Sequence, residues 1–250
     1  MLIKRFIITL QFMTTIPIKT KIDADAEDYG KGIVFAPLVG LVIGVILTLI
    51  CRGFLLIFPP FLTAVLIIIS YIILTGGLHL DGLGDTFDGV FSNRPKEKIL
   101  EIMRDSCHGT NALLAVTSII ILYIALIYSI INQGTEIKAL LLMPVGGRIA
   151  SLIGAGISEY ARSGEGMGKP FTDYCGKREI ISGLPLYALI SFIIAGLNGL
   201  LMIVFSSLSA FFLVKYFERK IGGTTGDILG AVCELNQALF LILWYIIYNL

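Results

Sequence analysis

Long apolar segments are the feature that most constrains what this chain can fold into. A segment that crosses a lipid bilayer must satisfy its own backbone hydrogen bonds, so only α-helices and closed β-barrels span membranes. The apolar segments here are continuous and rich in Ile and Leu, without the alternation of a barrel strand, and they have the length of transmembrane helices. They occupy residues 33–51, 54–75, 110–131, 139–157, 181–198, 200–214 and 229–249.

These segments predict an all-α fold, a polytopic membrane helical bundle of about seven transmembrane helices. The fifth and sixth segments form one long run divided near Asn198-Gly199, so the number is six if the chain does not turn there. Only 15% of the residues are charged, compared with about 25% in ordinary soluble domains. Neither an internal repeat nor a Pro-rich linker marks a second domain, so residues 1–250 are predicted to form a single integral membrane domain.

Overall composition excludes several classes of partner and site. The net charge is +1, so the chain lacks the global basic field of a nucleic-acid-binding protein. The four cysteines are far apart and form no CxxC pair, which argues against a zinc or redox motif. We interpret them as ordinary small residues: Cys51, Cys107, Cys175 and Cys233.

The amino-terminal stretch resembles a signal peptide only in part. Lys4 and Arg5 precede a short apolar run, but no small-residue cleavage site follows, and Pro17 and Lys19 end the run. We therefore predict a retained interfacial or re-entrant helix.

The connections between the apolar segments alternate in character. Three are short and nearly free of Lys and Arg: Phe58 to Pro60, Asn132 to Glu136, and Asn198-Gly199. The others are long and charged: Lys19 to Lys31, Leu78 to His108, Glu159 to Glu179, and Lys215 to Asp227. By the positive-inside rule, the long connections are cytoplasmic. The sequence thus predicts a multi-pass protein of the cytoplasmic (inner) membrane whose chemistry faces the cytoplasm.

Three aspartates in the 75–89 stretch, TGGLHLDGLGDTFDG, carry the strongest chemical signal. Asp81, Asp85 and Asp88 stand at positions i, i+4 and i+7 and would share one face of a helix. Crowded carboxylates at a membrane boundary repel one another unless a cation lies among them, and Mg²⁺ is the usual cation in phosphate chemistry. The competing interpretation is a solvated acidic helix end. Interleaved glycines are costly in such a helix, and they would let a phosphate approach the backbone.

His79 stands two residues before Asp81. It is a candidate base, metal ligand or phosphate contact, although a lone histidine is more often a structural hydrogen-bonding residue. Further along, Arg104 and Asp105 directly precede the third apolar segment, where Asp105 suits either a helix cap or a further metal ligand. Arg104 is a candidate phosphate contact, and His108 is left unassigned.

Two later segments add cations, glycines and acids. Arg148 lies in the middle of its apolar segment, which indicates a polar cavity or a displaced segment boundary. Between Tyr160 and Phe171, three glycines at alternate positions form a loop flanked by Arg162 and Lys169, and such a loop suits phosphate binding.

The last apolar segment carries two acids on one helical face. Asp227 follows Gly226 at its start, and Glu234 lies seven residues later inside the apolar region. A buried carboxylate needs a partner. The sequence leaves open whether a metal or Arg148 serves Glu234.

Several of these motifs resemble the cobalamin (5′-phosphate) synthases, also called adenosylcobinamide-GDP ribazoletransferases. The resemblance rests on GGLHLDGLGDTFDG at 76–89, with support from LQFMTTIP at 10–17, EIMRDS at 101–106, YARxxGxG at 160–167 with its glycines offset by one position, and TGDILGA at 225–231. It covers nearly the whole chain. The sequence departs from the family pattern at Cys107, His108, Cys233 and Gln237.

The resemblance implies a single catalytic domain that joins adenosylcobinamide-GDP to α-ribazole or its 5′-phosphate and releases GMP, with Mg²⁺ as cofactor. It implies Asp81, Asp85, Asp88 and His79 as catalytic residues, and Asp105 and Asp227 as further metal ligands. Arg104, Arg148, Arg162, Lys169 and Gly226 become candidates for binding the diphosphate or guanosine. Membrane lipid is an expected partner, and a homo-oligomer or an association with other corrinoid-pathway enzymes is left open.

Two other functions remain as alternatives. A CDP-alcohol phosphotransferase begins its signature with DxxDG, as Asp85 to Gly89 do, but Ser92-Asn93 stand where Ala-Arg is expected. An ion-coupled transporter would use Arg148 and Glu234 as membrane-embedded binding groups. Transporters place such groups at the bilayer midplane, whereas most carboxylates here gather on one side.

Overall fold

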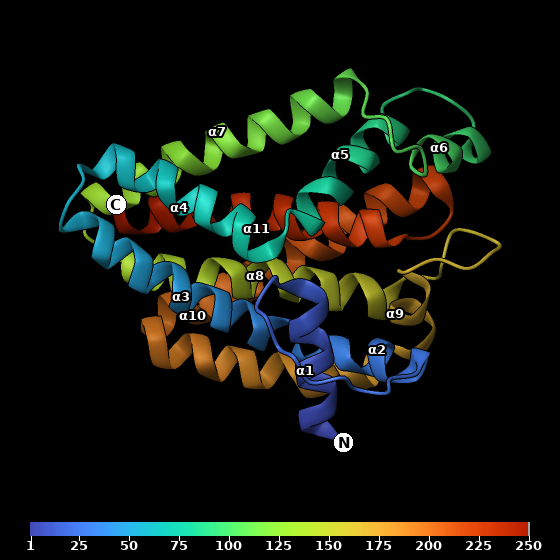
Figure 1. The fold of residues 1–250 in the computed structure, drawn as a ribbon, viewed down its shortest axis with the longest axis horizontal. Coiled ribbons are helices and arrows are strands. Elements are labelled where there is room, and N and C mark those ends of the chain that lie inside the picture. The colour runs from blue at the N-terminus through green and yellow to red at the C-terminus, as the bar shows by residue number, and fades with distance from the viewer. Residues whose placement is uncertain (250) are drawn as a thin grey trace.

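The computed structural model describes residues 1–249, and within that range it confirms the all-α prediction (Figure 1). The only β pairing there is an isolated bridge between Tyr160 and Thr224. The elements are α1 (Leu2–Met13), α2 (Ala26–Gly32), the 3₁₀ turn η1 (Ile33–Phe35), α3 (Ala36–Leu55), α4 (Pro60–Thr75), α5 (Leu78–Val90), α6 (Lys96–Ile102), α7 (Thr110–Asn132), α8 (Glu136–Ile157), α9 (Lys169–Tyr174), α10 (Lys177–Ile221) and α11 (Gly226–Asn249).

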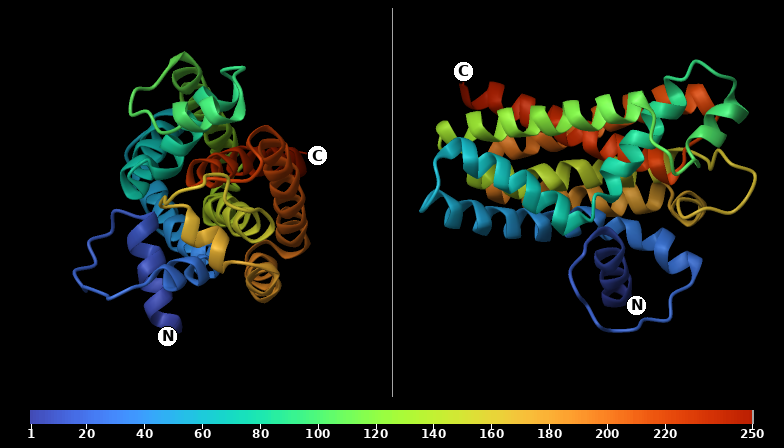
Figure 2. Two further views of the ribbon diagram at one scale, coloured as in Figure 1. Left: turned by 90° about the vertical axis from the view of Figure 1, so that its right-hand side faces the viewer. Right: turned by 45° about the horizontal axis from the view of Figure 1, so that its top comes forward.

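Helix α8 is the centre of the bundle, and α3, α10 and α11 pack around it. The end-on view in Figure 2 shows α8 surrounded by these helices. Two glycines of α3 allow close contact with its backbone: a Cβ on Gly40 would come within 2.5 Å of the Pro144 carbonyl oxygen, and one on Gly44 within 2.5 Å of the Leu141 carbonyl oxygen. Lipid gives helices little hydrophobic reason to associate, so small residues that let backbones approach supply much of the packing.

Among residues 1–249, five helices are long and apolar enough to cross a membrane, and the number rises to six if α4 and α5 form one broken span. These two helices meet at a 90° bend. The apolar part of the pair is α4, whereas α5 carries three carboxylates. We therefore treat α4 as the membrane-spanning part and α5 as lying at the membrane boundary.

Helix α10 contains a break at Gly196, whose φ of 60° and ψ of −140° are not helical. Ile180 before the break and Val214 after it pack beside Gly156 and Gly154 of α8. In a straight helix Ile180 and Val214 would lie about 50 Å apart, so the chain reverses direction between them. The reversal lies two residues before the predicted division. If the two halves of α10 are counted as separate spans, the largest possible number of spans rises from six to seven, the predicted number.

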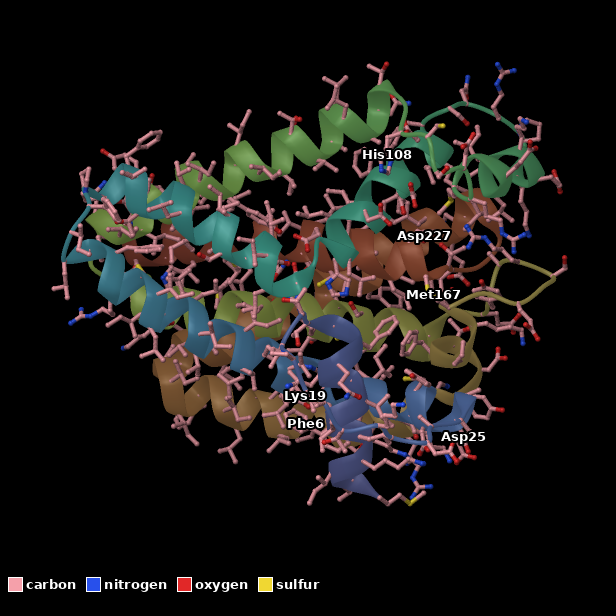
Figure 3. The ribbon with its side chains drawn as sticks, in the orientation of Figure 1. Phe6, Lys19, Asp25, His108, Met167 and Asp227 are labelled. Atoms are coloured by element: carbon pink, nitrogen blue, oxygen red, sulfur yellow. The ribbon has the colours of Figure 1, made fainter. Side chains whose placement is uncertain are left out.

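The two ends of the bundle differ in chemistry. One end of the bundle holds the turn between α3 and α4, the turn between α7 and α8, and the carboxy-terminal end of α11 (Figure 1). The other end holds α5, α6, α9 and the 158–168 loop. The labelled His108, Asp227 and Met167 all lie at this second end, here called the polar end (Figure 3). The short and the charged connections therefore separate as the sequence predicts.

Helix α1 has only 12 residues, too few to cross a bilayer. It lies against the side of the bundle, and Met1, Leu2 and Ile3 are exposed. Lys4 and Arg5 hold it there through ion pairs with Asp28 at the start of the next helix, at 2.5 and 3.2 Å. This arrangement agrees with the predicted interfacial helix.

Candidate active site

Helix α5 owes its position to glycines. Gly76 and Gly77 adopt left-handed backbone conformations, with φ of 62° and 70°, and turn the chain sharply out of α4. Gly82 packs on the backbone of α11, where an added Cβ would lie 2.8 Å from the Asp227 carbonyl oxygen. Gly84 faces Ala112 of α7. The interleaved glycines thus serve helix packing, and of Gly76 and Gly77 only Gly77 faces open space, because a Cβ on Gly76 would lie 3.2 Å from the Thr15 methyl group.

Two of the three aspartates of α5 form a cluster with a histidine from the next loop. The His108 ring lies 3.7 Å from Asp81 Oδ1 through Nε2 and 3.6 Å from Asp85 Oδ1 through Nδ1. The ligand atoms of all three residues lie within 4.8 Å of one another, a spacing that fits one metal ion. The side chains of Asp81 and His108 are 64% and 52% exposed, so ions in solution reach the cluster.

Asp85 is the most enclosed member of this cluster, with 16% of its side chain exposed. Burial, and after it the negative charges of Asp81 and Asp227, raise the pKa of Asp85 to about 7. A cation at the cluster would relieve this repulsion. The electrostatics therefore favour a bound cation beside Asp81 and Asp85.

Asp88 points elsewhere. Its carboxylate accepts hydrogen bonds from the backbone N–H groups of Gly109 and Ala112, the latter at 2.9 Å, and so caps the amino terminus of α7. A carboxylate at this place also interacts favourably with the helix dipole. Asp105 is exposed and accepts a hydrogen bond from the Cys107 N–H at 3.0 Å. Neither residue belongs to the cluster of Asp81, Asp85 and His108.

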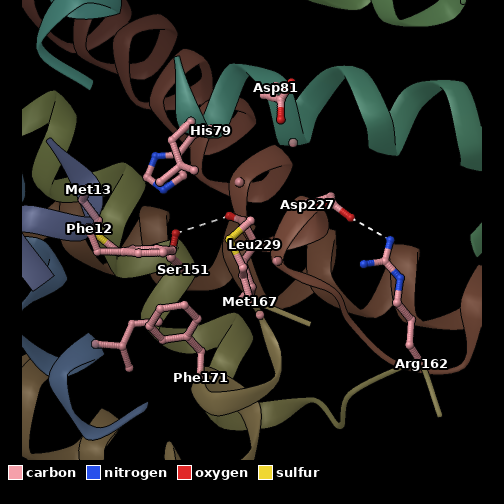
Figure 4. Close-up of a pocket in the computed structure, with 16 residues that line it drawn as sticks. Phe12, Met13, His79, Asp81, Ser151, Arg162, Met167, Phe171, Asp227 and Leu229 are labelled. Atoms are coloured by element: carbon pink, nitrogen blue, oxygen red, sulfur yellow. Dashed lines mark hydrogen bonds and ion pairs between the residues drawn. The ribbon is translucent and has the colours of Figure 1, made fainter. Parts of the chain in front are cut away.

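Asp227 lies across a small cavity from Asp81, at the start of α11 (Figure 4). Its Oδ2 accepts hydrogen bonds from Arg162 Nη2 at 2.9 Å and from Thr225 Oγ1 at 3.2 Å. The Tyr160–Thr224 bridge brings the Arg162 loop to this helix end, with Ala161 N–H donating to the Thr224 carbonyl at 2.8 Å.

The cavity between α5 and α11 has a volume of about 130 Å³. It brings the aspartates Asp81 and Asp227 and the arginine Arg162 together. Its lining includes Phe12, Met13, Leu78, His79, Asp81, Gly82, Ser151, Arg162, Met167, Gly168, Phe171, Gly226, Asp227 and Gly230.

The glycine loop approaches α11 closely, because Gly168 and Gly226 are in backbone contact. Both line the cavity. Two other predicted phosphate contacts lie further out. Arg104 Nη2 donates to the Glu165 carbonyl at 3.4 Å, and Lys169 is paired with Asp173 at 2.6 Å.

Arg148 does not line the cavity. It is fully buried one turn before Ser151, and its Nη1 donates to Gln237 Oε1 at 2.8 Å. The Gln237 amide in turn donates to Glu234 Oε2 at 3.1 Å. The geometry thus gives Arg148 a partner inside the bundle.

Glu234 is 1% exposed and accepts hydrogen bonds from two tyrosines, Tyr71 at 2.6 Å and Tyr123 at 2.8 Å. Together with Gln237 and Arg148, these residues form a buried polar network that joins α4, α7, α8 and α11. The open question about Glu234 is answered by this network: its partners are tyrosine hydroxyls and an amide, with the arginine one step away.

His79 lies between the network and the cavity, is 7% exposed, and borders the cavity (Figure 4). Its Nδ1 has no hydrogen-bond partner among the described residues. His79, Cys233 and Glu234 also have the spacing of a metal site. The two Glu234 oxygens already accept hydrogen bonds, so this group suits a polar contact better than an ion.

The sequence missed His108 as a member of the acidic cluster. It follows Asp105 closely, but only the fold of the 103–109 loop brings its ring over α5. Phe12 and Met13 were also missed as cavity-lining residues. Their position inside the 10–17 motif is the signal that would have found them.

Comparison with known proteins gives one consistent result. A family model described as cobalamin-5-phosphate synthase matches residues 5–245. A protein of Acetivibrio thermocellus named adenosylcobinamide-GDP ribazoletransferase is 56% identical over 244 residues, which cover 98% of each chain. A protein of Clostridium acetobutylicum with the same name is 54% identical over 97% of this chain and 96% of its own length. No solved structure matches the chain.

Proposed function

The chain belongs to the cobalamin-5-phosphate synthase family and carries out the adenosylcobinamide-GDP ribazoletransferase step that completes cobalamin assembly; we propose that this reaction takes place at the polar end of the bundle, around Asp81. The observation that carries the proposal is that an acidic cluster and an arginine–aspartate pair meet at one cavity. Asp81 belongs to the cluster with Asp85 and His108, and it faces the Arg162–Asp227 pair across the cavity.

The reaction needs a hydroxyl group of one substrate to meet a phosphorus atom of the other. An α-ribazole hydroxyl oxygen attacks the phosphorus next to the cobinamide arm and forms a new P–O bond. The P–O bond to the GMP phosphate breaks, and GMP leaves with the bridging oxygen and its electron pair. The same step with α-ribazole 5′-phosphate gives the 5′-phosphate of the product. Catalysis of such a transfer consists largely of positioning and charge stabilisation.

Asp81 and Asp85 would hold Mg²⁺ in this proposal. The fit rests on their two carboxylates, because Mg²⁺ prefers oxygen ligands, and on the raised pKa of Asp85, which is caused first by burial and then by the negative charges of Asp81 and Asp227. When bound, the cation supplies charge neutralisation for phosphate oxygens. Asp227 is the further candidate ligand, whereas Asp88 and Asp105 act through α7 and its preceding loop.

Arg162 is the residue best placed to bind the diphosphate, because its guanidinium borders the cavity and Asp227 orients it at 2.9 Å. Arginine suits phosphate because its fork of donors matches phosphate geometry. A carboxylate at the cavity accepts the hydroxyl proton. His79 and Gly226 form part of the cavity wall.

We place the enzyme in the cytoplasmic membrane with its polar end facing the cytoplasm. Support comes from the Lys- and Arg-rich connections on that end and from the short connections at the other, which are nearly free of Lys and Arg. The family membership also decides against the CDP-alcohol phosphotransferase and transporter alternatives.

The test is GMP release from adenosylcobinamide-GDP and α-ribazole by the purified protein in lipid, with and without Mg²⁺. The wild type is expected to need both substrates and the metal, and Asp85→Asn is expected to lose about 100-fold or more in kcat, the scale reported when one charge-stabilising group is removed. Asp23→Asn, an exposed aspartate in the 14–25 segment, serves as the matched control. Full activity of Asp85→Asn, or activity in the presence of a chelator, would overturn the assignment of the site.

A further inference from the structure

A second hollow lies on the opposite side of α5, in the angle that α5 makes with α4 and α7. We call it the α7 groove. Its volume is about 650 Å³, within the range of about 300–1,000 Å³ typical of small-molecule sites. Its walls come from Ile72 and Leu80, from Gly76 and Gly77 at the bend, and from Leu113, Val116 and Ile120 of α7.

Asp81 joins the two hollows. It is the only residue that lines both the cavity beside Arg162 and the α7 groove. At the Asp81 end of the groove stand His108 and Thr110, and the rest of the wall is apolar or glycine. Whatever occupies the groove therefore has an apolar body and a polar tip that reaches the acidic cluster.

The charges of the two hollows are complementary to different substrates. The cavity contains Arg162, whereas no Lys or Arg lines the α7 groove in the described part of the chain. A diphosphate is favoured beside the arginine. An uncharged aromatic ring is favoured by the apolar walls of the groove.

The geometry of the reaction also favours one hollow for each substrate. In phosphoryl transfer the attacking and leaving oxygens lie roughly in line on opposite sides of the phosphorus. Two hollows that meet at one acidic residue from opposite sides of a helix provide that arrangement, one for each reactant.

We propose that the α7 groove is the binding site of the acceptor substrate, α-ribazole, with its benzimidazole ring against α7 and its ribose hydroxyl at Asp81. The phosphates of adenosylcobinamide-GDP lie on the cavity side, beside Arg162. This inference rests on the proposed function and adds the division of the two substrates between the two sides of α5.

The test measures the KM for each of the two substrates separately. Leu113→Trp fills the groove with a larger side chain and is expected to raise the KM for α-ribazole about 10-fold, with the KM for adenosylcobinamide-GDP and kcat changed by less than about 2-fold. Val116→Phe, on the same wall, is a second variant for use if the first lowers the melting temperature. Met167→Trp, on the cavity side, is expected to show the opposite pattern.

Ile121→Trp is the matched control, since Ile121 lies on the same helix, is 61% exposed and lies outside the groove. It is expected to leave both KM values unchanged. If the groove holds a lipid chain instead, Leu113→Trp and Val116→Phe will change stability or lipid activation without a selective rise in the KM for α-ribazole, and the inference is overturned. Absence of GMP release from the wild type would instead contradict the proposed function itself.

Discussion

The three aspartates of α5 have separate tasks despite their regular spacing. Asp81 and Asp85 face His108 and one another, whereas Asp88 turns to the amino terminus of α7. A shared helical face brings side chains near each other, but each carboxylate takes the strongest donors within its reach. Removing Asp88 should therefore weaken α7, and removing Asp85 should weaken cation binding.

The first prediction concerns pH. Because the pKa of Asp85 is raised to about 7, a proton competes with Mg²⁺ for this carboxylate below pH 7. Mg²⁺ affinity should rise as the pH increases from 6 to 8, and Asp85→Asn should remove most of that dependence. Isothermal titration with Mg²⁺ at several pH values measures it. Asp88→Asn is the control and should keep the pH dependence; a flat profile in the wild type would contradict the prediction.

Arg148 and Glu234 illustrate how a bundle accommodates charge. Neither has more than 1% of its surface exposed, and they are linked through Gln237. Removal of one member of a buried charge pair leaves the other uncompensated, at a cost of about 3–5 kcal/mol. The network therefore holds four helices in register.

The second prediction is that Glu234→Gln destabilises the protein by about 3 kcal/mol. Thermal unfolding in detergent measures it. The double variant Arg148→Met with Glu234→Gln should be less destabilised than the sum of the single variants, because no buried charge remains unpaired. Glu101→Gln, which breaks an exposed ion pair with Lys98, should cost less than about 1 kcal/mol. If the stability losses of the two single variants add up to that of the double variant, the coupling of Arg148 and Glu234 is contradicted.

At the scale of helices, glycine decides where the chain bends and how closely α5 packs. The bend between α4 and α5 depends on left-handed Gly76 and Gly77, and the reversal of α10 depends on Gly196. The conformation of Gly196 is one that residues with a Cβ rarely adopt. These turns place the acidic face of α5 beside α11 and return α10 along α8.

The third prediction tests the reversal. Gly196→Ala should destabilise the protein by about 1–3 kcal/mol through backbone strain alone, because an added Cβ would meet no atom within 4 Å. Gly53→Ala is matched, since that site is equally open but lies in the helix α3. It should be neutral or stabilising by up to about 1 kcal/mol. Unfolding temperatures of the two variants make the comparison, and an unaffected Gly196→Ala would contradict a fixed reversal.

At the scale of the whole molecule, the two ends are chemically distinct. The acidic cluster, the Arg162–Asp227 pair and the glycine loop gather at the polar end, and short connections close the other. Helix α7 links the ends, and its 23 residues measure about 34 Å, enough to cross the hydrocarbon core. Orientation therefore determines which compartment supplies the substrates.

The fourth prediction uses the only exposed cysteine of the four, Cys107 at the polar end. A membrane-impermeant maleimide should label it in inverted membrane vesicles and not in intact cells. Asn132→Cys in a Cys107→Ser background places the thiol at the other end of α7 and should show the reverse. Labelling of Cys107 in intact cells would contradict the cytoplasmic orientation.

The sequence by itself determined the features that depend on local composition and spacing. Apolar length predicted the membrane helices, and charge asymmetry predicted the two ends, because bilayer thickness and backbone hydrogen bonding act on each segment separately. Resemblance carried by the motifs at 76–89 and 225–231 predicted the family, which the comparisons confirm. The carboxylate pair of Asp81 and Asp85 was also predicted.

Only the tertiary structure decided which of the polar residues meet. Asp88 became a cap, Arg148 an internal partner of Gln237, and His108 a member of the acidic cluster. Helical periodicity places side chains on a face, but their partners come from other helices far away in the chain. Hydrogen bonds and ion pairs form over about 3–4 Å, a range that spacing in sequence does not resolve until the helices are packed.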